Sequence, residues 1–216
     1  MTAPKIKGIL LVAPVADITR LVQEGRITRD DLETELGAEA RKVVTDGVSI
    51  VSWYAVGIYR DIARLLMKFD GKGHHDLAYM RRRGERAGQR LVESGLYQQL
   101  DFLKRRTGER REERLSHEVF EQTVRMVVSM QAALIQGVAW TVTQDPEHRD
   151  RIQIELADAD GMPEECAQAA CGIVTGITKH GGADFAWRYE RPSIGRIVFR
   201  MDRDIGVLHL EGTKRR

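Results

Sequence analysis

The chain has few cysteines, few prolines and few aromatic residues. Its 216 residues include 2 cysteines, 5 prolines and 6% aromatic residues. Cys166 and Cys171 are five positions apart in an expected helix, so their side chains point in different directions and we expect no disulfide between them. Free thiols agree with a reducing compartment, which favours a cytoplasmic protein.

Long apolar runs and common catalytic motifs are also missing. No stretch approaches the roughly 20 apolar residues that cross a bilayer. The apolar stretch 8–15 is too short for a signal peptide and is followed by no clear cleavage signal. We find no nucleophile elbow, phosphate loop, dinucleotide fingerprint or HExxH motif, so the usual evidence for an enzyme is absent. We therefore expect no membrane span and a binding module before an enzyme.

Net charge is only +2, but the positive charges are clustered. A solvated surface held by salt bridges explains such clusters, and an acidic protein partner is the alternative. Nucleic acid is disfavoured as a partner because no aromatic residues are interleaved with the basic ones. The candidate partner-binding residues are Arg81, Arg82, Arg83, Arg105 and Arg106.

The first two thirds of the chain predict helices. Thr28 and Asp31 have the spacing of a helix N-cap, and a helical period runs from Trp53 to Phe69. Gly84 and Gly88 lie on one face of a helix expected within 76–103. Glycine inside a helix is unfavourable, so this face is expected to cross another backbone closely. A long amphipathic helix, expected from Ser116 to Thr143, is a candidate homodimer interface.

The period changes after Pro146. Alternating apolar residues predict strands at 152–156, 185–189 and 197–201, with a further strand at 205–210 and a helix from Pro163 to His180. We expect a single domain, 1–216, with a mainly helical part, 1–145, and a strand–helix–strand–strand part, 150–210. The fold class is α+β: a helical bundle packed on a small, three- to four-stranded antiparallel sheet that the C-terminal third forms.

Several patterns occur in a familiar order: Lys7-Gly8, Trp53-Tyr54 leading into Tyr59 and Leu65-Leu66, Arg83-Gly84, and the block 163–201. In this order the chain resembles a myxobacterial paralogous family of unknown function. More distantly, it is similar to the superfamily of vinyl-reductase-type sensor domains, haem nitric-oxide/oxygen-binding domains and TRAPP subunits. The resemblance implies a helical bundle on a four-stranded antiparallel sheet, a cavity between the two, and homodimerisation.

The cofactor residues of these relatives do not carry over. Haem-binding relatives use a helix histidine and a Tyr-x-Ser-x-Arg motif, whereas Tyr189, Ser193 and Arg196 stand at other intervals. Phenol-sensing relatives hold zinc with cysteines, and only Cys166 lies near such a position. We therefore expect no haem or metal cofactor. Cys166 and Cys171 are interpreted as small core residues, with cavity lining, acylation or metal binding as alternatives.

The aromatic residues near the C-terminus have two interpretations. Large side chains that alternate along a strand cover a sheet, but they also line apolar pockets. The candidate ligand pocket comprises Trp187, Tyr189, Phe185, Phe199 and Cys166, closed by Trp53 and Tyr54. The predicted function is a non-enzymatic, homodimeric module that senses a small hydrophobic molecule or mediates protein contacts. The alternative is a haem- or metal-dependent gas sensor or a reductase-like enzyme.

Overall fold

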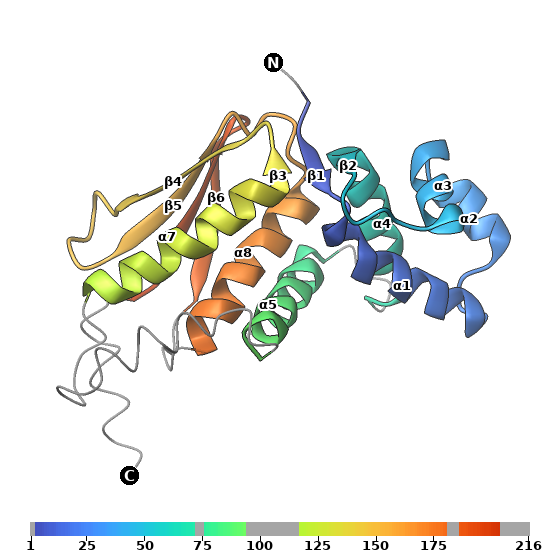
Figure 1. Ribbon diagram of the computed structural model, residues 1–216, viewed down its shortest axis with the longest axis horizontal. Coiled ribbons are helices and arrows are strands. Elements are labelled where there is room, and N and C mark those ends of the chain that lie inside the picture. Colours follow the sequence, from blue (N-terminus) through green and yellow to red (C-terminus); the bar gives the residue numbers. More distant parts are fainter. Residues whose placement is uncertain (1–2, 72–75, 94–116, 181–185, 204–216) are drawn as a thin grey trace, which may run out of the picture.

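The protein is built from helices and two antiparallel sheets (Figure 1). The computed structural model describes residues 3–71, 76–93, 117–180 and 186–203. The described helices are α1 (Ile9–Gln23), α2 (Arg29–Glu35), α3 (Ala38–Asp46), α4 (Val56–Phe69), α5 (Leu77–Glu93), α7 (His117–Leu134) and α8 (Glu164–His180). The described strands are β1 (Lys5–Lys7), β2 (Trp53–Ala55), β3 (Ile135–Gln136), β4 (Ala139–Gln144), β5 (Ile152–Ala157), β6 (Trp187–Ser193) and β7 (Arg196–Met201).

The larger sheet has the order β4-β5-β7-β6, and each neighbouring pair is antiparallel. Its register places Val142, Ile154, Phe199 and Tyr189 in one row across the four strands. Helices α7 and α8 lie along one face of this sheet (Figure 1). The α+β class and the packing of helices on an antiparallel sheet are therefore confirmed. The predicted strand at 205–210 lies outside the described residues.

The predicted long helix from Ser116 to Thr143 is wrong beyond Leu134. After α7 the chain forms β3, turns at Gly137, which has a φ of +81°, and continues as β4. The apolar residues after Leu134 fit a helical period, but Trp140, Thr141, Val142 and Thr143 are aromatic or β-branched residues that suit a strand. Because β4 pairs with β5 along its whole length, the sheet begins before the C-terminal third.

A second, three-stranded sheet was not predicted. Its order is β2-β1-β3, so β1 pairs with a segment near residue 54 on one side and with a segment near residue 135 on the other. Trp53 and Tyr54, expected to begin a helix, form β2 instead, and α4 begins at Val56. Together with β4, these short strands interrupt the part of the chain that was expected to be mainly helical.

The N-terminal helices follow their sequence signals closely. Thr28 and Asp31 form a complete capping box at the start of α2. The predicted stripe of α4 is buried, with Ile62 and Leu66 fully enclosed. Buried side chains from these helices and from the sheet form one hydrophobic core cluster.

Helices α5 and α8 cross with their backbones in contact. A Cβ atom on Gly84 would lie 2.1 Å from the carbonyl oxygen of Ala169, and one on Gly88 would lie 2.4 Å from that of Ile173. The contact is reciprocal, because Gly172 and Gly176 of α8 would each place a Cβ atom 2.1 Å from a carbonyl oxygen of α5. The close approach predicted from Gly84 and Gly88 is confirmed, and α8 is its partner.

We predict that Gly172→Ala lowers the free energy of unfolding by at least about 2 kcal/mol, because its Cβ meets rigid backbone rather than a movable side chain. Gly57→Ala in α4 is the matched control, since its Cβ meets only the tip of Arg60 at 3.9 Å. The control should change stability by less than about 1 kcal/mol. Urea denaturation followed by circular dichroism measures both. Equal stability of the two variants would contradict the tight crossing.

Candidate functional site

A groove of about 1110 Å³ opens where the N-terminal helices meet the sheet and α8. One wall comes from α4 and the start of α5, and the other comes from the β5–α8 loop, the first turn of α8 and the β6–β7 turn. The lining residues are Arg60, Arg64, Met67, Leu77, Asp160, Gly161, Met162, Pro163, Glu164, Glu165, Arg191, Ser193 and Ile194. The groove therefore combines an apolar surface with charges of both signs.

Arg191 fixes the wall on the sheet side. Its Nη1 donates to Glu164 Oε1 at 2.6 Å and to the carbonyl of Met162 at 3.0 Å, while its Nη2 donates to the carbonyl of Ala159 at 2.9 Å. The Tyr189 hydroxyl donates to the other oxygen of Glu164. The β6–β7 turn, the β5–α8 loop and the start of α8 are thus joined by one guanidinium and one carboxylate.

Two arginines one helical turn apart line the α4 wall. Arg64 Nε donates to Glu165 Oε1 at 2.7 Å, although 59% of the Arg64 side chain is exposed and the Glu165 side chain is only 6% exposed. Arg60 donates through Nε and Nη2 to a single oxygen of Asp61. The ion pair between Arg64 and Glu165 links α4 directly to α8.

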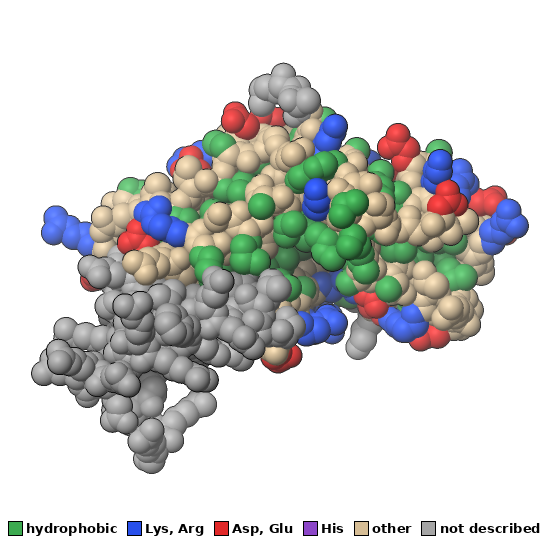
Figure 2. Space-filling model, in the orientation of Figure 1, with side chains coloured by type: hydrophobic (Ala, Val, Ile, Leu, Met, Phe, Trp, Pro, Cys, Tyr) green, Lys and Arg blue, Asp and Glu red, His purple; other side chains and the backbone are tan. Residues whose placement is uncertain are grey.

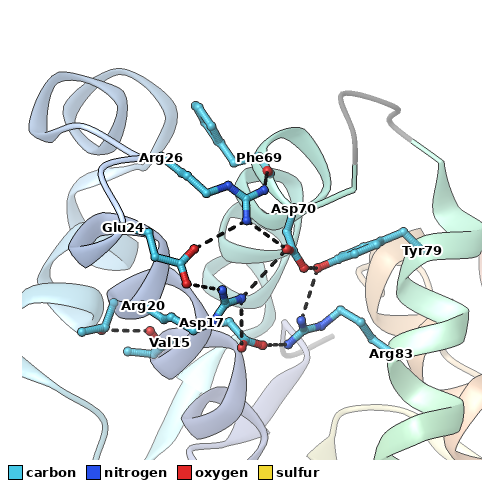
Figure 3. Close-up of polar contacts among 10 residues, drawn as sticks. Val15, Asp17, Arg20, Glu24, Arg26, Phe69, Asp70, Tyr79 and Arg83 are labelled. Carbon is cyan, nitrogen blue, oxygen red and sulfur yellow. Dashed lines mark hydrogen bonds and ion pairs between the residues drawn. The ribbon is translucent and has the colours of Figure 1, made fainter.

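A polar network holds α5 against α1 and the end of α4 (Figure 3). Arg83 Nη2 donates to Asp17 of α1 at 2.5 Å, and Arg83 Nη1 donates to the Tyr79 hydroxyl at 3.2 Å. Tyr79 in turn donates to Asp70 at 2.6 Å, just after α4. Burial, reinforced by this hydrogen bond, raises the pKa of Tyr79 to about 12.

The arginines that were candidates for partner binding lie in different environments. Arg83 has a side chain only 16% exposed and is bound to Asp17, so it stabilises the helix packing. Arg82 is exposed on α5, and Arg81 is half-buried. Arg105 and Arg106 lie outside the described residues.

The aromatic candidates pack as core rather than around an opening. Trp187 and Phe199 have no exposed area, and Trp187 Nε1 donates to Thr178 Oγ1 of α8 at 3.2 Å. The rings of Trp140 and Tyr189 each lie 6.2 Å from the Phe199 ring. Of this group, Tyr189 reaches the groove through its hydrogen bond to Glu164. Phe185 lies outside the described residues.

The remaining pocket candidates are separated from one another. Cys166 is buried in the first turns of α8. Trp53 and Tyr54 belong to the three-stranded sheet, where Lys7 Nζ lies 4.7 Å above the Trp53 ring and the Tyr54 hydroxyl accepts from the amide of Ser49. These side chains do not line the groove.

The charged residues of the groove were not predicted from the sequence. Two patterns in the sequence pointed to them. Arg60 and Arg64 are one turn apart on a predicted helix, and two acidic residues follow Pro163. Each pattern is common on solvated helices, however, and only the packing of α4 against α8 brings them together.

The described residues do not fit haem or a structural metal. His148 is the only histidine whose side chain is described, and it is exposed after β4. Burial raises the pKa of the Cys166 and Cys171 thiols to about 12, which opposes the thiolate form that binds metals. Within the described ranges, no group of three or more His, Cys, Asp or Glu side chains is arranged to hold a metal ion. No helix in those ranges is long and apolar enough to cross a membrane.

Comparison with solved structures identifies similar folds. The Fe(II) unliganded H-NOX protein from K. algicida has a TM-score of 0.58 at 9% identity, covering 91% of this chain and 95% of that chain. The fold is similar to that of the H-NOX proteins. An H-NOX protein from S. oneidensis in the Fe(II)NO ligation state has a TM-score of 0.50 at 11% identity, covering 91% of this chain and 98% of that chain.

A subunit 3 of the trafficking protein particle complex from Naegleria fowleri, covalently bound to palmitic acid, has a TM-score of 0.39 at 14% identity, covering 69% of this chain and 96% of that chain. No family model and no curated protein matches the sequence. The distant similarity to haem nitric-oxide/oxygen-binding domains that the sequence indicated is confirmed for the fold.

We predict that the two thiols do not react with Ellman's reagent at pH 8 in the folded protein, and that both react in guanidinium chloride. Their raised pKa also affects stability. The thiols remain neutral in the folded state while unfolded thiols ionise near pH 9, so their contribution to stability is complete below pH 9 and decreases above it. Absorbance at 412 nm and denaturation at pH 8 and pH 10 measure these effects. Rapid labelling of the folded protein would contradict the burial.

Proposed function

We propose that the chain is a non-enzymatic, cytoplasmic module that senses a small molecule bound in the groove. The supporting observation is that the groove is lined from two sides, by α4 and α5 and by α8 and the β6–β7 turn. A ligand there would contact both sets of elements at once. Its binding free energy would therefore depend on how the helices sit against the sheet.

The ion pair between Arg64 and Glu165 gives this dependence a physical basis. It joins α4 to α8 beside the groove, and Glu165 is almost fully buried. A ligand that pairs with Arg64 would change the contacts of this junction. Ligand binding shifts a conformational equilibrium only when the affinities for the two states differ. A ligand that contacts both walls would meet this condition if α4 and α8 change their relative position between the two states.

The similarity to H-NOX folds supports a haem-dependent gas sensor as a second candidate. The described side chains do not fit haem, so we rank the haem-dependent gas sensor below a sensor of a small molecule bound in the groove. The visible absorption spectrum of the purified protein separates the two. A Soret band that changes with nitric oxide would favour the haem candidate, and its absence after reconstitution with haem would remove that candidate.

We predict that Ile194→Asp weakens the binding of groove ligands by about ten-fold or more. The side chain is 72% exposed at the rim, so the change removes apolar contact and leaves the fold intact. The control is Val22→Asp, which alters a 38% exposed aliphatic residue that does not line the groove. Thermal shift against a panel of small amphipathic compounds identifies ligands, and calorimetry compares the three proteins.

Hydrogen exchange tests the sensing step separately. A bound ligand should slow amide exchange in α4 and in the first turn of α8. If no compound of the panel binds, or if Ile194→Asp and Val22→Asp weaken binding equally, the groove is not the ligand site.

Protein contact is favoured by an apolar surface on another part of the molecule. Ile9 and Val12 of α1 and Ile50 and Val51 of the loop between α3 and β2 are exposed. The loop lies against the start of α1, because Gly8 donates to the Ser52 carbonyl at 2.9 Å. Figure 2 shows hydrophobic side chains gathered near the middle of this face, where Figure 1 places β1, β2 and the start of α1. Apolar patches of this kind mark association surfaces.

We predict that the protein forms a homodimer through this surface and that Val51→Asp converts it to a monomer, because a charge buried in an apolar contact is unfavourable. Sedimentation velocity at several protein concentrations measures the change. Ile194→Asp is the control and should remain dimeric. A wild-type protein that is monomeric at all concentrations would contradict the homodimer.

A further inference from the structure

Hydrogen-bond donors and acceptors are unequally occupied in the groove. A guanidinium group carries five N–H donors. Among the described residues, Arg64 uses Nε on Glu165, and its two terminal nitrogens have no protein acceptor. Arg60 uses Nε and Nη2 on Asp61, which leaves Nη1. Free donors therefore line the α4 wall.

Most acceptors of the groove are already engaged. Both oxygens of Glu164 accept hydrogen bonds, one from Arg191 and one from Tyr189. Glu165 accepts from Arg64 and is almost completely buried. Asp160 is the remaining carboxylate, and it is exposed at the rim next to Gly195. A ligand entering the groove meets unengaged donors on α4 and few free acceptors.

The apolar part of the groove adjoins these donors. Met67 lies on α4 one turn after Arg64, Leu77 begins α5, and Ile194 stands at the tip of the β6–β7 turn. Such a surface accepts an aliphatic or aromatic body of a ligand whose polar end lies near the arginines. The volume of about 1110 Å³ leaves room for both.

We infer that the groove binds an amphipathic monocarboxylic acid, with the carboxylate accepting two hydrogen bonds from the terminal nitrogens of Arg64. The fork of a guanidinium matches a carboxylate in geometry, and charge-assisted pairs of this kind are the stronger hydrogen bonds. The negative charge of Asp160 disfavours a dianion such as a phosphate monoester. This inference rests on the proposed function, because it names the chemistry of the ligand for the same groove.

The test compares three probes with the same eight-carbon chain: octanoate, 1-octanol and octylamine. Calorimetry at low ionic strength should show octanoate binding about ten-fold or more tightly than 1-octanol, with octylamine weakest, because only the carboxylate forms a charge-assisted, bidentate pair with the free donors. Arg64→Lys keeps the charge beside Glu165 but lacks the fork. It should lose most of the preference for octanoate while leaving the affinity for 1-octanol unchanged.

Two further variants keep the test decisive if Arg64→Lys folds poorly. Arg60→Gln lies outside the ion pair with Glu165 and should weaken octanoate binding by a few-fold. Arg125→Gln removes an exposed ion pair with Glu121 on α7 and is the matched control, so octanoate affinity should not change.

The outcomes separate this inference from the proposed function. If 1-octanol binds as tightly as octanoate and Ile194→Asp weakens both, the groove is a ligand site but not a carboxylate site. If octanoate binds equally well to wild type, Arg64→Lys and Arg60→Gln, the assignment to the arginines is overturned. If no probe binds and the wider panel also fails, the proposed function fails with it.

Discussion

The contact between the backbones of α5 and α8 is the constraint on which the rest of the structure depends. Gly84 and Gly88 on one helix and Gly172 and Gly176 on the other have no Cβ where the helices cross, so each helix lies against carbonyl oxygens of its partner. Helix α8 also packs on the sheet through Trp187 and Phe199. Helix α5 is held to α1 by Arg83 and Asp17. The crossing thus fixes the distance between the N-terminal helices and the sheet, and the groove lies along that junction.

Elements with a complete local signal could be predicted from the sequence. The capping box of Thr28, the apolar stripe of α4 and the glycine face of α5 each depend on residues close in the chain, and each was found. Residues 135–143 were assigned to a helix because their apolar spacing fits that period, whereas the pairing of β4 with β5 is a tertiary interaction that no local pattern contains. The groove was missed for a similar reason. Arg64 and Glu165 are 101 positions apart, and only the packed fold brings them together.

The groove also illustrates that a likeness in fold does not by itself show what a chain binds. A helical layer packed on an antiparallel sheet provides a junction, and the side chains at that junction determine what binds there. In this chain Trp187 and Phe199 are fully buried on the sheet, and charged residues of the groove gather at the start of α8. Trp187 and Phe199, two of the pocket candidates, belong to the hydrophobic core cluster. Tyr189 belongs both to the core and to the groove, because its ring packs on Phe199 and its hydroxyl donates a hydrogen bond to Glu164.

The central position of β1 in the small sheet bears on how the chain folds. Ile6 pairs with Tyr54 on one side and with Ile135 on the other. The first strand therefore completes its hydrogen bonds only after more than half of the chain is available. Closing so long a loop is entropically unfavourable, and contacts between distant segments slow folding. During synthesis the helices α1 to α5 would emerge while one edge of β1 is still unpaired, and the arrival of β3 would close that edge. Completion of the small sheet in the N-terminal part therefore depends on a strand that is synthesised later, in addition to the packing between the two parts.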